Sequence, residues 1–200
     1  MPVHAVLKTI CNLCLLAALA ACGGGGSDVN VQVPNDPAAP TPSPTPGAQS
    51  YRYVRLEATS EINARPWASM AEFNVVDAAG AAYPRTGWSI TADSEENNAA
   101  VLGGGYRPAE HALDGNAQTM WHTSFSLGSP PMPHWVVVDM KAARAVRGFV
   151  YMPRSDGATN GTIAGFNFSG SNDGSNWTLL ISGNFNNYAT VGNQKTVTLP

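Results

Sequence analysis

Residues 51 to 75 read YRYVRLEATSEINARPWASMAEFNV, and this stretch decides the fold. Apolar and polar side chains alternate twice within it, first from Val54 to Ala58 and again from Ala71 to Val75. A period of two predicts β-strands with one buried face. Between the two runs, NARPW supplies turn-forming residues and a tryptophan. The stretch therefore predicts a pair of half-buried strands at the start of the folded part of the chain.

The rest of the chain indicates an all-β domain. Only 12% of the 200 residues are charged, and the chain contains 20 glycines and 15 prolines. Clusters of Gly, Asn, Asp and Pro separate short apolar runs, none of which predicts a helix longer than a turn or two. Such spacing is typical of a β-sandwich or jelly roll. Strands are expected at residues 88–92, 134–139, 146–152, 163–168, 177–181 and 195–199, with Trp135, Phe168 and Trp177 in the core.

The first 22 residues resemble the signal peptide of a bacterial lipoprotein. Lys8 precedes an apolar core at residues 9–21, which is too short for a standard transmembrane helix. The core ends in LAAC, which is similar to a lipobox and implies cleavage before Cys22 and lipidation of its thiol. An ordinary secretory signal with an incidental cysteine is the alternative. All three cysteines lie in this segment, so no disulfide is expected in the folded domain.

Residues 23–50 predict a linker, flexible at GGGGS and extended in the proline-rich part that follows. The folded domain is expected at residues 51–200. The resemblance to lipoproteins implies a place in the bacterial cell envelope. Because Gly23 rather than Asp follows the cysteine, the outer membrane of a Gram-negative cell is the expected membrane. The lipid anchor is the only expected contact with the membrane.

Three motifs follow one another in residues 112–180. They read ALDGNAQTMWHT, PHWVVVDM and GFVYMPRSDGATNGTIAGFNFSGSNDGSNWTLL. This ordered set resembles the discoidin, or coagulation factor 5/8 type C, family, and within it the family 32 carbohydrate-binding modules of bacteria. The resemblance covers nearly all of residues 51–200. It implies a jelly-roll β-sandwich of the galactose-binding-domain type, with ligands bound by loops at one end.

The order of the segments departs from that family. A segment like residues 51–75 forms the C-terminal end of these modules, after a strand like KTVTL at residues 195–199. Here it comes first, so the resemblance predicts a circularly permuted domain, which is geometrically simple when terminal strands lie close together. The alternative is the remnant of an upstream tandem copy, which would leave an apolar sheet edge exposed. The permutation requires Val54 and Phe73 to be buried.

The loop from Asp114 to Thr119 contains several oxygen-bearing groups. Taken alone, it predicts an Asx-turn in which Asp114 accepts hydrogen bonds from its own loop. Ca²⁺ also prefers carboxylate, carbonyl and hydroxyl oxygens. The resemblance implies a structural Ca²⁺ site with ligands from Ala71 (through its carbonyl), Glu72, Asp114, Asn116 and Thr119. Such a metal would join distant parts of the folded chain.

A sugar site needs an aromatic platform and directional polar groups. The resemblance locates these groups in five places. They are ENNAA (residues 96–100), WHT (121–123), the residue after WHTS (125), PR (153–154) and the NG that follows DG (160–161). It implies that the ligand-binding residues are Glu96, His122, Phe125, Arg154 and Asn160. Residues 101–110 depart from the family pattern as an insertion, which can reshape the site or add Tyr106 to it.

Four of these residues also have a purely structural interpretation. His122 can be a histidine at the edge of the core, and Phe125 an ordinary core residue. Arg154 can form an ion pair with Asp156 on the surface. Asn160 can serve only to make a turn.

Catalysis is not expected. No two carboxylates stand out as an acid–base pair, and the sequence contains no nucleophile elbow, zinc motif or phosphate loop. The net charge of −3 argues against nucleic acid as a partner, because that partner requires a basic face. The expected function is non-catalytic binding of glycans, galactose-type sugars in particular, by a lipid-anchored module. The alternative is a protein-binding or adhesion module without a sugar ligand.

Overall fold

The computed structural model describes residues 49–98, 100, 105–185 and 192–200. The predicted signal peptide, the lipidated Cys22 and nearly all of the predicted linker lie outside these residues. Ser50, assigned to the linker above, is already the first residue of a strand. No helix among the described residues has the length and apolar character needed to cross a bilayer.

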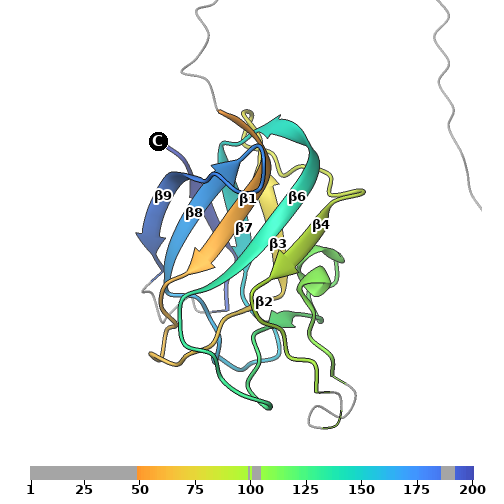
Figure 1. Cartoon of the computed structure of the whole chain (residues 1–200), viewed down its shortest axis with the longest axis vertical. Helices are drawn as coiled ribbons and strands as arrows, with labels where there is room; N and C mark the ends of the chain where they lie inside the picture. The colour runs from red at the N-terminus through yellow and green to blue at the C-terminus, as the bar shows by residue number, and fades with distance from the viewer. Residues whose placement is uncertain (1–48, 99, 101–104, 186–191) are drawn as a thin grey trace, which may run out of the picture. The chain divides into compact units, whose positions relative to one another are not determined.

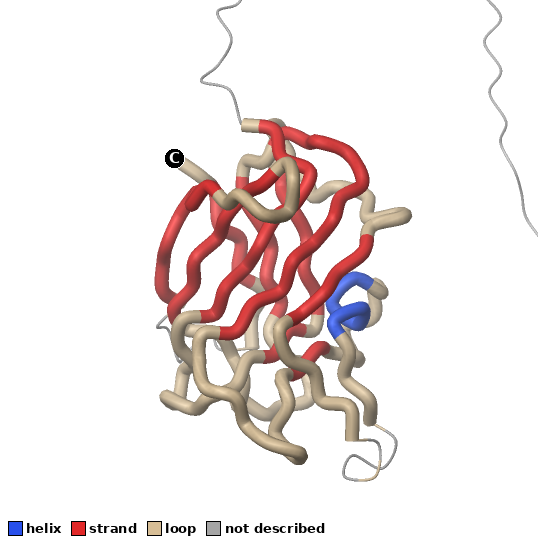
Figure 2. Tube along the Cα trace, in the orientation of Figure 1, coloured by secondary structure: helices blue, strands red, loops and turns tan. Residues whose placement is uncertain are grey.

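The described residues form a β-sandwich (Figures 1 and 2). Its helical part is the short 3₁₀ helix η1 (Ala109–Leu113), so the expectation of an all-β domain is confirmed. The strands in chain order are β1 (Ser50–Ala58), β2 (Ser69–Met70), β3 (Glu72–Val76), β4 (Ser89–Ala92), β5 (Trp121–His122), β6 (His134–Ala145), β7 (Gly148–Met152), β8 (Gly165–Ser171), β9 (Thr178–Asn184) and β10 (Lys195–Thr198).

Two antiparallel sheets make the layers of the sandwich. The larger sheet has the strand order β4-β6-β1-β8-β9, and the smaller sheet has the order β10-β7-β3. In Figure 1, β3 and β7 are seen behind β1 and β6. The short pair β2 and β5 lies apart from both sheets and brings Ser69 opposite His122. A sandwich of this kind buries the inner face of each sheet against the other.

Aromatic side chains fill the space between the sheets. Phe73 of β3 stacks on Phe149 of β7, with ring centroids 6.0 Å apart, and tilts against Phe168 of β8 at 6.5 Å. Leu56 of β1 lies opposite both Val136 and Phe168 in the larger sheet. The core is therefore shared by strands from the beginning and the end of the folded chain.

The stretch that opens the folded chain completes both sheets. β1 lies at the centre of the larger sheet, while β3 pairs with one side of β7 and β10 pairs with the other. Val54 is 0% exposed and Phe73 is 1% exposed, as the permutation requires. An exposed remnant of another copy would leave these side chains in water. Burial at this level supports the permuted order instead.

Two of the three large side chains expected in the core lie elsewhere. Phe168 is buried as expected, but Trp135 and Trp177 are only half-buried. Trp135 alternates along β6 with the buried His134 and Val136, so the pleat turns its ring to the outer face. The Trp177 ring lies 4.9 Å from the guanidinium carbon of Arg55. The expectation that Trp135 and Trp177 lie in the core was wrong, because an apolar residue type does not reveal which face of a strand it occupies.

Candidate functional site

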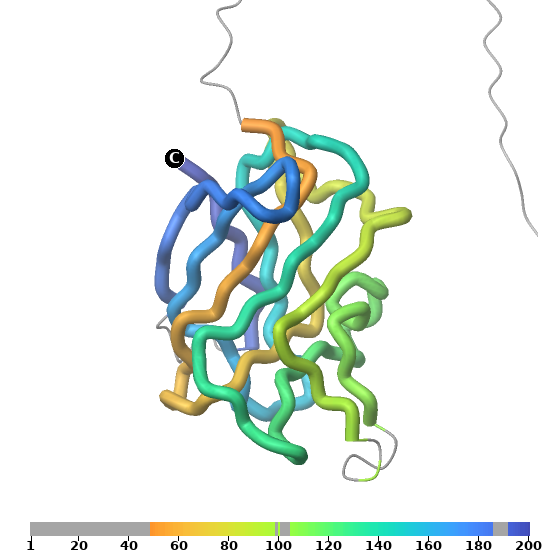
Figure 3. Tube along the Cα trace, viewed as in Figure 1, coloured from red at the N-terminus to blue at the C-terminus, as the bar shows by residue number. Residues whose placement is uncertain are grey.

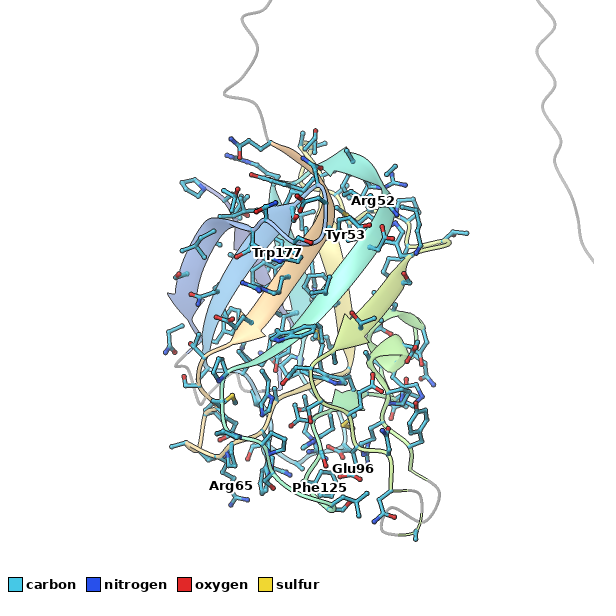
Figure 4. The ribbon with its side chains drawn as sticks, viewed as in Figure 1. Arg52, Tyr53, Arg65, Glu96, Phe125 and Trp177 are labelled. Carbon is cyan, nitrogen blue, oxygen red and sulfur yellow. The ribbon has the colours of Figure 1, made fainter. Side chains whose placement is uncertain are left out.

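The candidate site lies in the loops at one end of the sandwich. Strands β1, β4 and β7 end there, and β6 and β8 begin there, so the connecting loops gather at that end (Figure 2). Figure 4 shows Glu96 and Phe125 at this end, near Arg65, and Trp177 toward the opposite end. We call these loops together the loop end, which comprises residues 59–68, 93–98, 105–108, 121–133 and 153–164.

His122 on β5 is a buried, neutral hydrogen-bond acceptor. Its Nδ1 lies 2.7 Å from the carbonyl oxygen of Thr123. A carbonyl can only accept, so Nδ1 carries the proton and Nε2 keeps its lone pair. Nε2 has no hydrogen-bond partner among the described residues. Burial lowers the pKa of His122 to about 4; the Thr123 hydrogen bond opposes this shift, and the positive charge of Arg154 adds to it.

Two further rings flank this histidine. Phe125 meets His122 edge-on at a centroid distance of 4.9 Å, and Trp67 lies 6.4 Å away from the same imidazole. Trp67 is fixed by a 3.1 Å hydrogen bond from Nε1 to Ser129 Oγ and lies under the guanidinium of Arg65. Phe125 and Trp67 are both half-buried. The loop end therefore contains a row of three rings, two of which reach the surface.

Arg154 organises the loop that faces this row. Its Nε and Nη2 donate to the two carboxylate oxygens of Asp156 at 2.7 and 2.6 Å, and Nη1 donates to the carbonyl of Asn160 at 2.9 Å. The structural interpretation of Arg154, an ion pair with Asp156, is thus present. The hydrogen bonds from Arg154 lower the pKa of Asp156 to about 2, against the effect of burial.

Asn160 and Gly161 bring that loop against His122. The side-chain amide of Asn160 is half-buried and makes no hydrogen bond with the described residues. Gly161 has φ +85° and packs so closely that a Cβ on it would lie 3.1 Å from His122 Nε2 and 2.7 Å from Ser69 Oγ. The close approach explains why glycine occupies this position.

Glu96 holds the loop that carries Phe125. Its Oε2 accepts from the backbone N–H groups of Phe125 and Ser126 at 2.8 and 2.9 Å. Its Oε1 accepts from the Asn98 N–H at 2.9 Å and from Ser126 Oγ at 2.6 Å. Burial would raise the pKa of Glu96, but these hydrogen bonds outweigh it and lower the pKa to about 2. Both oxygens are engaged by the protein, so Glu96 positions Phe125, and direct contact with a ligand stays a prediction.

The five residues predicted from the sequence therefore lie in one site, with three more beside them. Glu61, which is 3% exposed, accepts hydrogen bonds from the backbone N–H groups of Arg65 and Gly161 and so joins two loops. Trp67 and Arg65 come from the NARPW stretch, where the sequence shows a tryptophan next to turn-forming residues but assigns it no role. They follow β1 in the chain and reach His122 only through the tertiary fold.

In the described part of the insertion, Arg107 contacts the candidate site, whereas no hydrogen bond or ring contact of Tyr106 with the site residues is found among the described residues. Residues 101–104 lie outside the described part of the chain. The Arg107 backbone donates to the Glu96 carbonyl at 3.1 Å and accepts from the His122 N–H at 3.3 Å. The charge of Arg107 adds to burial in lowering the pKa of His122. Tyr106 is 49% exposed.

The predicted calcium loop is folded around the Asp114 carboxylate. Oδ1 accepts from the Asn116 N–H at 2.7 Å, which forms the Asx-turn that the loop alone predicts. Oδ2 accepts from Thr119 Oγ1 at 2.7 Å, and that hydroxyl also lies 2.8 Å from the Asn116 carbonyl oxygen. The loop therefore gathers a carboxylate, a carbonyl and a hydroxyl at one point.

Glu72 on β3 faces this loop. Its Oε2 accepts a hydrogen bond from Arg85 Nη1, while Oε1 is buried and has no partner among the described residues. Burial raises the pKa of Glu72; Arg85 opposes the rise, and the nearby Asp114 adds to it. A cavity of about 310 Å³ lies beside Glu72, Arg85 and Gly115.

These residues fit a Ca²⁺ ion. An unpartnered carboxylate oxygen next to a second carboxylate is the environment that a hard divalent cation stabilises. The described residues contain no cluster of three His, Cys, Asp or Glu side chains suited to a metal. A cation would therefore depend on Glu72 and Asp114 together with hydroxyl and carbonyl oxygens. Ala71, the remaining predicted ligand, is buried next to Glu72.

A jelly-roll sandwich with polar and aromatic loops gathered at one end is typical of a binding module. The chain belongs to the F5/8 type C domain family, which it matches over residues 89–200, more than half of its length. The family consists of carbohydrate-binding or discoidin-like modules. The match begins after residues 51–75, as the permuted order would require.

Two relatives each match about half of the chain. Galactose oxidase of Gibberella zeae is 36% identical over 99 residues, which cover 49% of this chain and 13% of that protein. A protein of Flavonifractor plautii named A type blood N-acetyl-alpha-D-galactosamine deacetylase is 34% identical over 118 residues, covering 54% of this chain and 14% of that protein. The chain thus spans about one seventh of the length of these relatives.

Proposed function

We propose that this chain is a non-catalytic glycan-binding module and that the loop end is its binding site. The observation that carries the proposal is the state of His122. This imidazole is neutral, has no hydrogen-bond partner for Nε2 among the described residues, and lies beside the two half-buried rings of Phe125 and Trp67. A hydrogen-bond acceptor beside apolar rings suits a sugar. The hydroxyl groups of a sugar donate hydrogen bonds, and its C–H groups pack on aromatic rings.

Each part of the site has a distinct task in this proposal. Phe125 packs against the C–H face of the sugar, and Glu96 fixes the height and tilt of its loop. His122 Nε2 is buried under Gly161, so a sugar hydroxyl would reach it after a shift of the Asn160 loop and would then supply a hydrogen-bond donor. The free amide of Asn160 adds a second polar contact. Arg154 is buried and all three of its guanidinium nitrogens donate to Asp156 or to the Asn160 carbonyl, so its task is to hold this loop in place.

The sugar is of the galactose type. The two relatives are named for galactose and for an N-acetylated galactosamine, and the present chain aligns with one domain of each. A single sugar site of this size gives weak affinity, which many copies on one surface raise through avidity. We also propose the anchor for such a surface. Cys22 carries the lipid, residues 23–50 give reach, and the bacterial outer membrane is the location.

A structural Ca²⁺ completes the proposal. Glu72, Asp114 and Thr119, with the carbonyl groups of Ala71 and Asn116, would hold the ion. Its chemistry is to neutralise two adjacent carboxylates and so to fix the Asp114 loop against β3. No step of sugar recognition is assigned to the metal.

A pair of aromatic variants tests the binding site. The protein from Gly23 to Pro200 is applied to a glycan array beside the variants Phe125→Ala and Trp177→Ala. Both rings are half-buried, but Phe125 is at the loop end and Trp177 lies toward the opposite end (Figure 4). We expect a roughly five- to hundredfold loss of binding to galactose-type glycans in Phe125→Ala, taking as a guide the about 1–3 kcal/mol that stacking of a nucleic-acid base on an aromatic side chain contributes. Trp177→Ala retains binding, and equal loss in both variants contradicts the site.

A second function is favoured by one observation. Leu127 at the loop end is 77% exposed, and such an apolar side chain suits a protein partner better than a sugar. Protein-binding or adhesion is therefore the second candidate. It predicts no binding to any glycan on the array and no effect of a sugar on the thermal stability of the protein.

A further inference from the structure

Arg85 occupies an unusual position for an arginine in a connecting loop. It lies between β3 and β4, and its Nη1 donates toward three oxygens of other segments. These are Glu72 Oε2, the Phe73 carbonyl at 2.8 Å and the Ala112 carbonyl at 3.2 Å. A single nitrogen thus serves a carboxylate and two carbonyls, an oxygen set of the kind that surrounds a bound cation.

The three oxygens belong to two parts of the fold. Glu72 and Phe73 are on β3 in the smaller sheet, while Ala112 is in η1, two residues before Asp114. Gly115 also lies close, because a Cβ on it would be 3.8 Å from Arg85 Nη2. The guanidinium therefore joins β3 directly to the start of the Asp114 loop.

The surroundings strengthen this connection. The side chains of Arg85 and Glu72 are 20% and 14% exposed, so water screens the pair less than it screens a surface ion pair. Hydrogen bonds to charged groups are stronger than neutral ones. Arginine also keeps its charge at any ordinary pH, so the connection does not depend on protonation.

We infer that Arg85 is a built-in cation that holds the Asp114 loop against β3. This inference rests in one respect on the calcium proposal above: the two cations share Glu72. Arg85 takes Oε2, and the oxygen left without a partner, Oε1, faces the proposed metal. The two links are therefore parallel, and either one keeps the loop attached when the other is absent.

Parallel links make a specific energetic prediction. The loss of one link is mild while the other remains, and the loss of both is larger than the sum of the separate losses. Independent interactions would instead give equal losses with and without calcium.

Hydrogen exchange measures the attachment of the loop directly. The protein from Gly23 to Pro200 and the variant Arg85→Gln are each followed in Ca²⁺ and in EDTA, with amides at residues 112–119 as the readout. The control variant is Arg52→Gln. Arg52 also forms an ion pair, at 2.9 Å with Asp139, but that pair joins β1 to β6 and includes no residue of the Asp114 loop.

We expect the parent protein to keep most protection at residues 112–119 in EDTA. Arg85→Gln in EDTA should exchange roughly ten- to a hundredfold faster there, which is the effect of losing a hydrogen bond to a charged group. Ca²⁺ should restore most of the protection in Arg85→Gln. Arg52→Gln should leave exchange at these amides unchanged in both conditions.

Two outcomes overturn the inference. One is a parent protein that loses protection in EDTA as fully as Arg85→Gln does, and the other is an Arg85→Gln loop that stays protected in EDTA. If Ca²⁺ alters neither protein but Arg85→Gln exchanges faster, the calcium proposal fails and the Arg85 link stands. If Arg85→Gln does not fold, Arg85→Met replaces it, because methionine keeps an apolar stem but has neither the charge nor the N–H donors. Unchanged exchange in Arg85→Met in EDTA then overturns the inference.

Discussion

Arg154 and Asp156 form a two-point ion pair, with Nε and Nη2 of the guanidinium 2.7 and 2.6 Å from the two carboxylate oxygens. The pair leaves Nη1 for the Asn160 carbonyl, so one arginine fixes both ends of the loop that faces His122. Asp156 can therefore affect the proposed glycan site without contact with a ligand.

The first prediction concerns this carboxylate. Asp156→Asn keeps the shape of the side chain but removes its charge, so Arg154 loses its partner and the Asn160 loop loosens. We expect a loss of about 1 kcal/mol in the free energy of unfolding, because solvent screens a side chain as exposed as that of Asp156. Urea unfolding gives this value. Glycan binding should fall several-fold.

The control for that variant is Asp77→Asn. Asp77 is a half-buried turn residue whose Oδ1 accepts backbone N–H groups at 2.9 and 2.8 Å, and asparagine can supply the same oxygen. It should change neither stability nor binding. Unchanged glycan affinity in Asp156→Asn would argue against a role for the Arg154 loop.

The second prediction concerns pH and His122. The imidazole has an ordinary pKa of 6.5 when unfolded and a pKa of about 4 in the folded protein. The unfolded chain thus binds the proton more tightly, so the stability from His122 is fully present above pH 6.5 and is lost as the pH falls toward 4. The loss across this window is on the order of 3 kcal/mol.

A comparison with His122→Asn isolates this effect. Asparagine can still donate to the Thr123 carbonyl but does not titrate, so the variant should lack this fall in stability. Other groups act differently. Burial would lower the His134 pKa, but the hydrogen bond and negative charge of Asp93, together with the Pro66 and Pro130 carbonyls, raise it. The stability that His134 contributes is therefore lost as pH rises. Equal pH profiles between pH 7 and 4 for the parent protein and His122→Asn would contradict the buried neutral state.

The third prediction uses two glycines of one loop. Gly157 and Gly161 have φ values of +82° and +85°, so alanine at either position strains the backbone by roughly 1–2 kcal/mol. A Cβ at position 157 meets nothing within 4 Å, whereas one at 161 meets Ser69 and His122. Both alanine variants should lose stability in urea, but only Gly161→Ala should also lose glycan binding. Equal loss of binding in both would assign the effect to strain alone.

The fourth prediction concerns metal removal. If Ca²⁺ binds the folded state alone, a concentration a hundredfold above its Kd stabilises the protein by about 2.7 kcal/mol. The melting temperature should rise when Ca²⁺ is added and should return to its original value when EDTA removes the ion. Asp114→Ala should abolish this shift, while Asp77→Ala at an exposed turn should retain it. A melting temperature unaffected by EDTA would count against the metal.

The fifth prediction tests whether the opening stretch belongs to the core. Leu56 is 2% exposed, and Leu56→Ala should cost about 2–5 kcal/mol through lost burial and the cavity left behind. Leu179 on the edge strand β9 is 59% exposed, and Leu179→Ala should cost less than about 0.5 kcal/mol. Chemical denaturation measures both, and similar costs would contradict the position of β1 in the larger sheet.

The turn chemistry that the sequence predicts is also present in the structure. Asn172, Asp173 and Gly174 form the turn between β8 and β9, where Gly174 has φ +75°. Asp173 accepts hydrogen bonds from the N–H groups of Ser175 and Asn176, so the loop is fixed locally. Short-range signals of this kind succeed because the interacting groups are neighbours in the chain.

The roles within the site could not be predicted in the same way. Glu96 was identified as a ligand acceptor, yet its two oxygens are engaged by groups from Asn98 and from the Phe125 loop, 29 residues away in the chain. Trp67 was read as part of a turn, yet it joins the ring row at His122. Both roles depend on distant segments, which spacing in the sequence does not reveal.

The sequence by itself determined the all-β class, the strands that begin at residue 51 and the residues that gather at the loop end. The alternation of apolar and polar residues and the local turn chemistry are short-range properties, so they can be recognised from the sequence without a structure. The tertiary structure alone decided which side of each strand faces the core and which buried polar atoms lack a hydrogen-bond partner among the described residues. It shows Trp177 half-buried outside the core, His122 Nε2 without a hydrogen-bond partner among the described residues, and Arg85 shared between β3 and the start of the Asp114 loop. Each of these depends on groups brought together from distant parts of the chain, where burial and unpaired hydrogen-bonding atoms become visible.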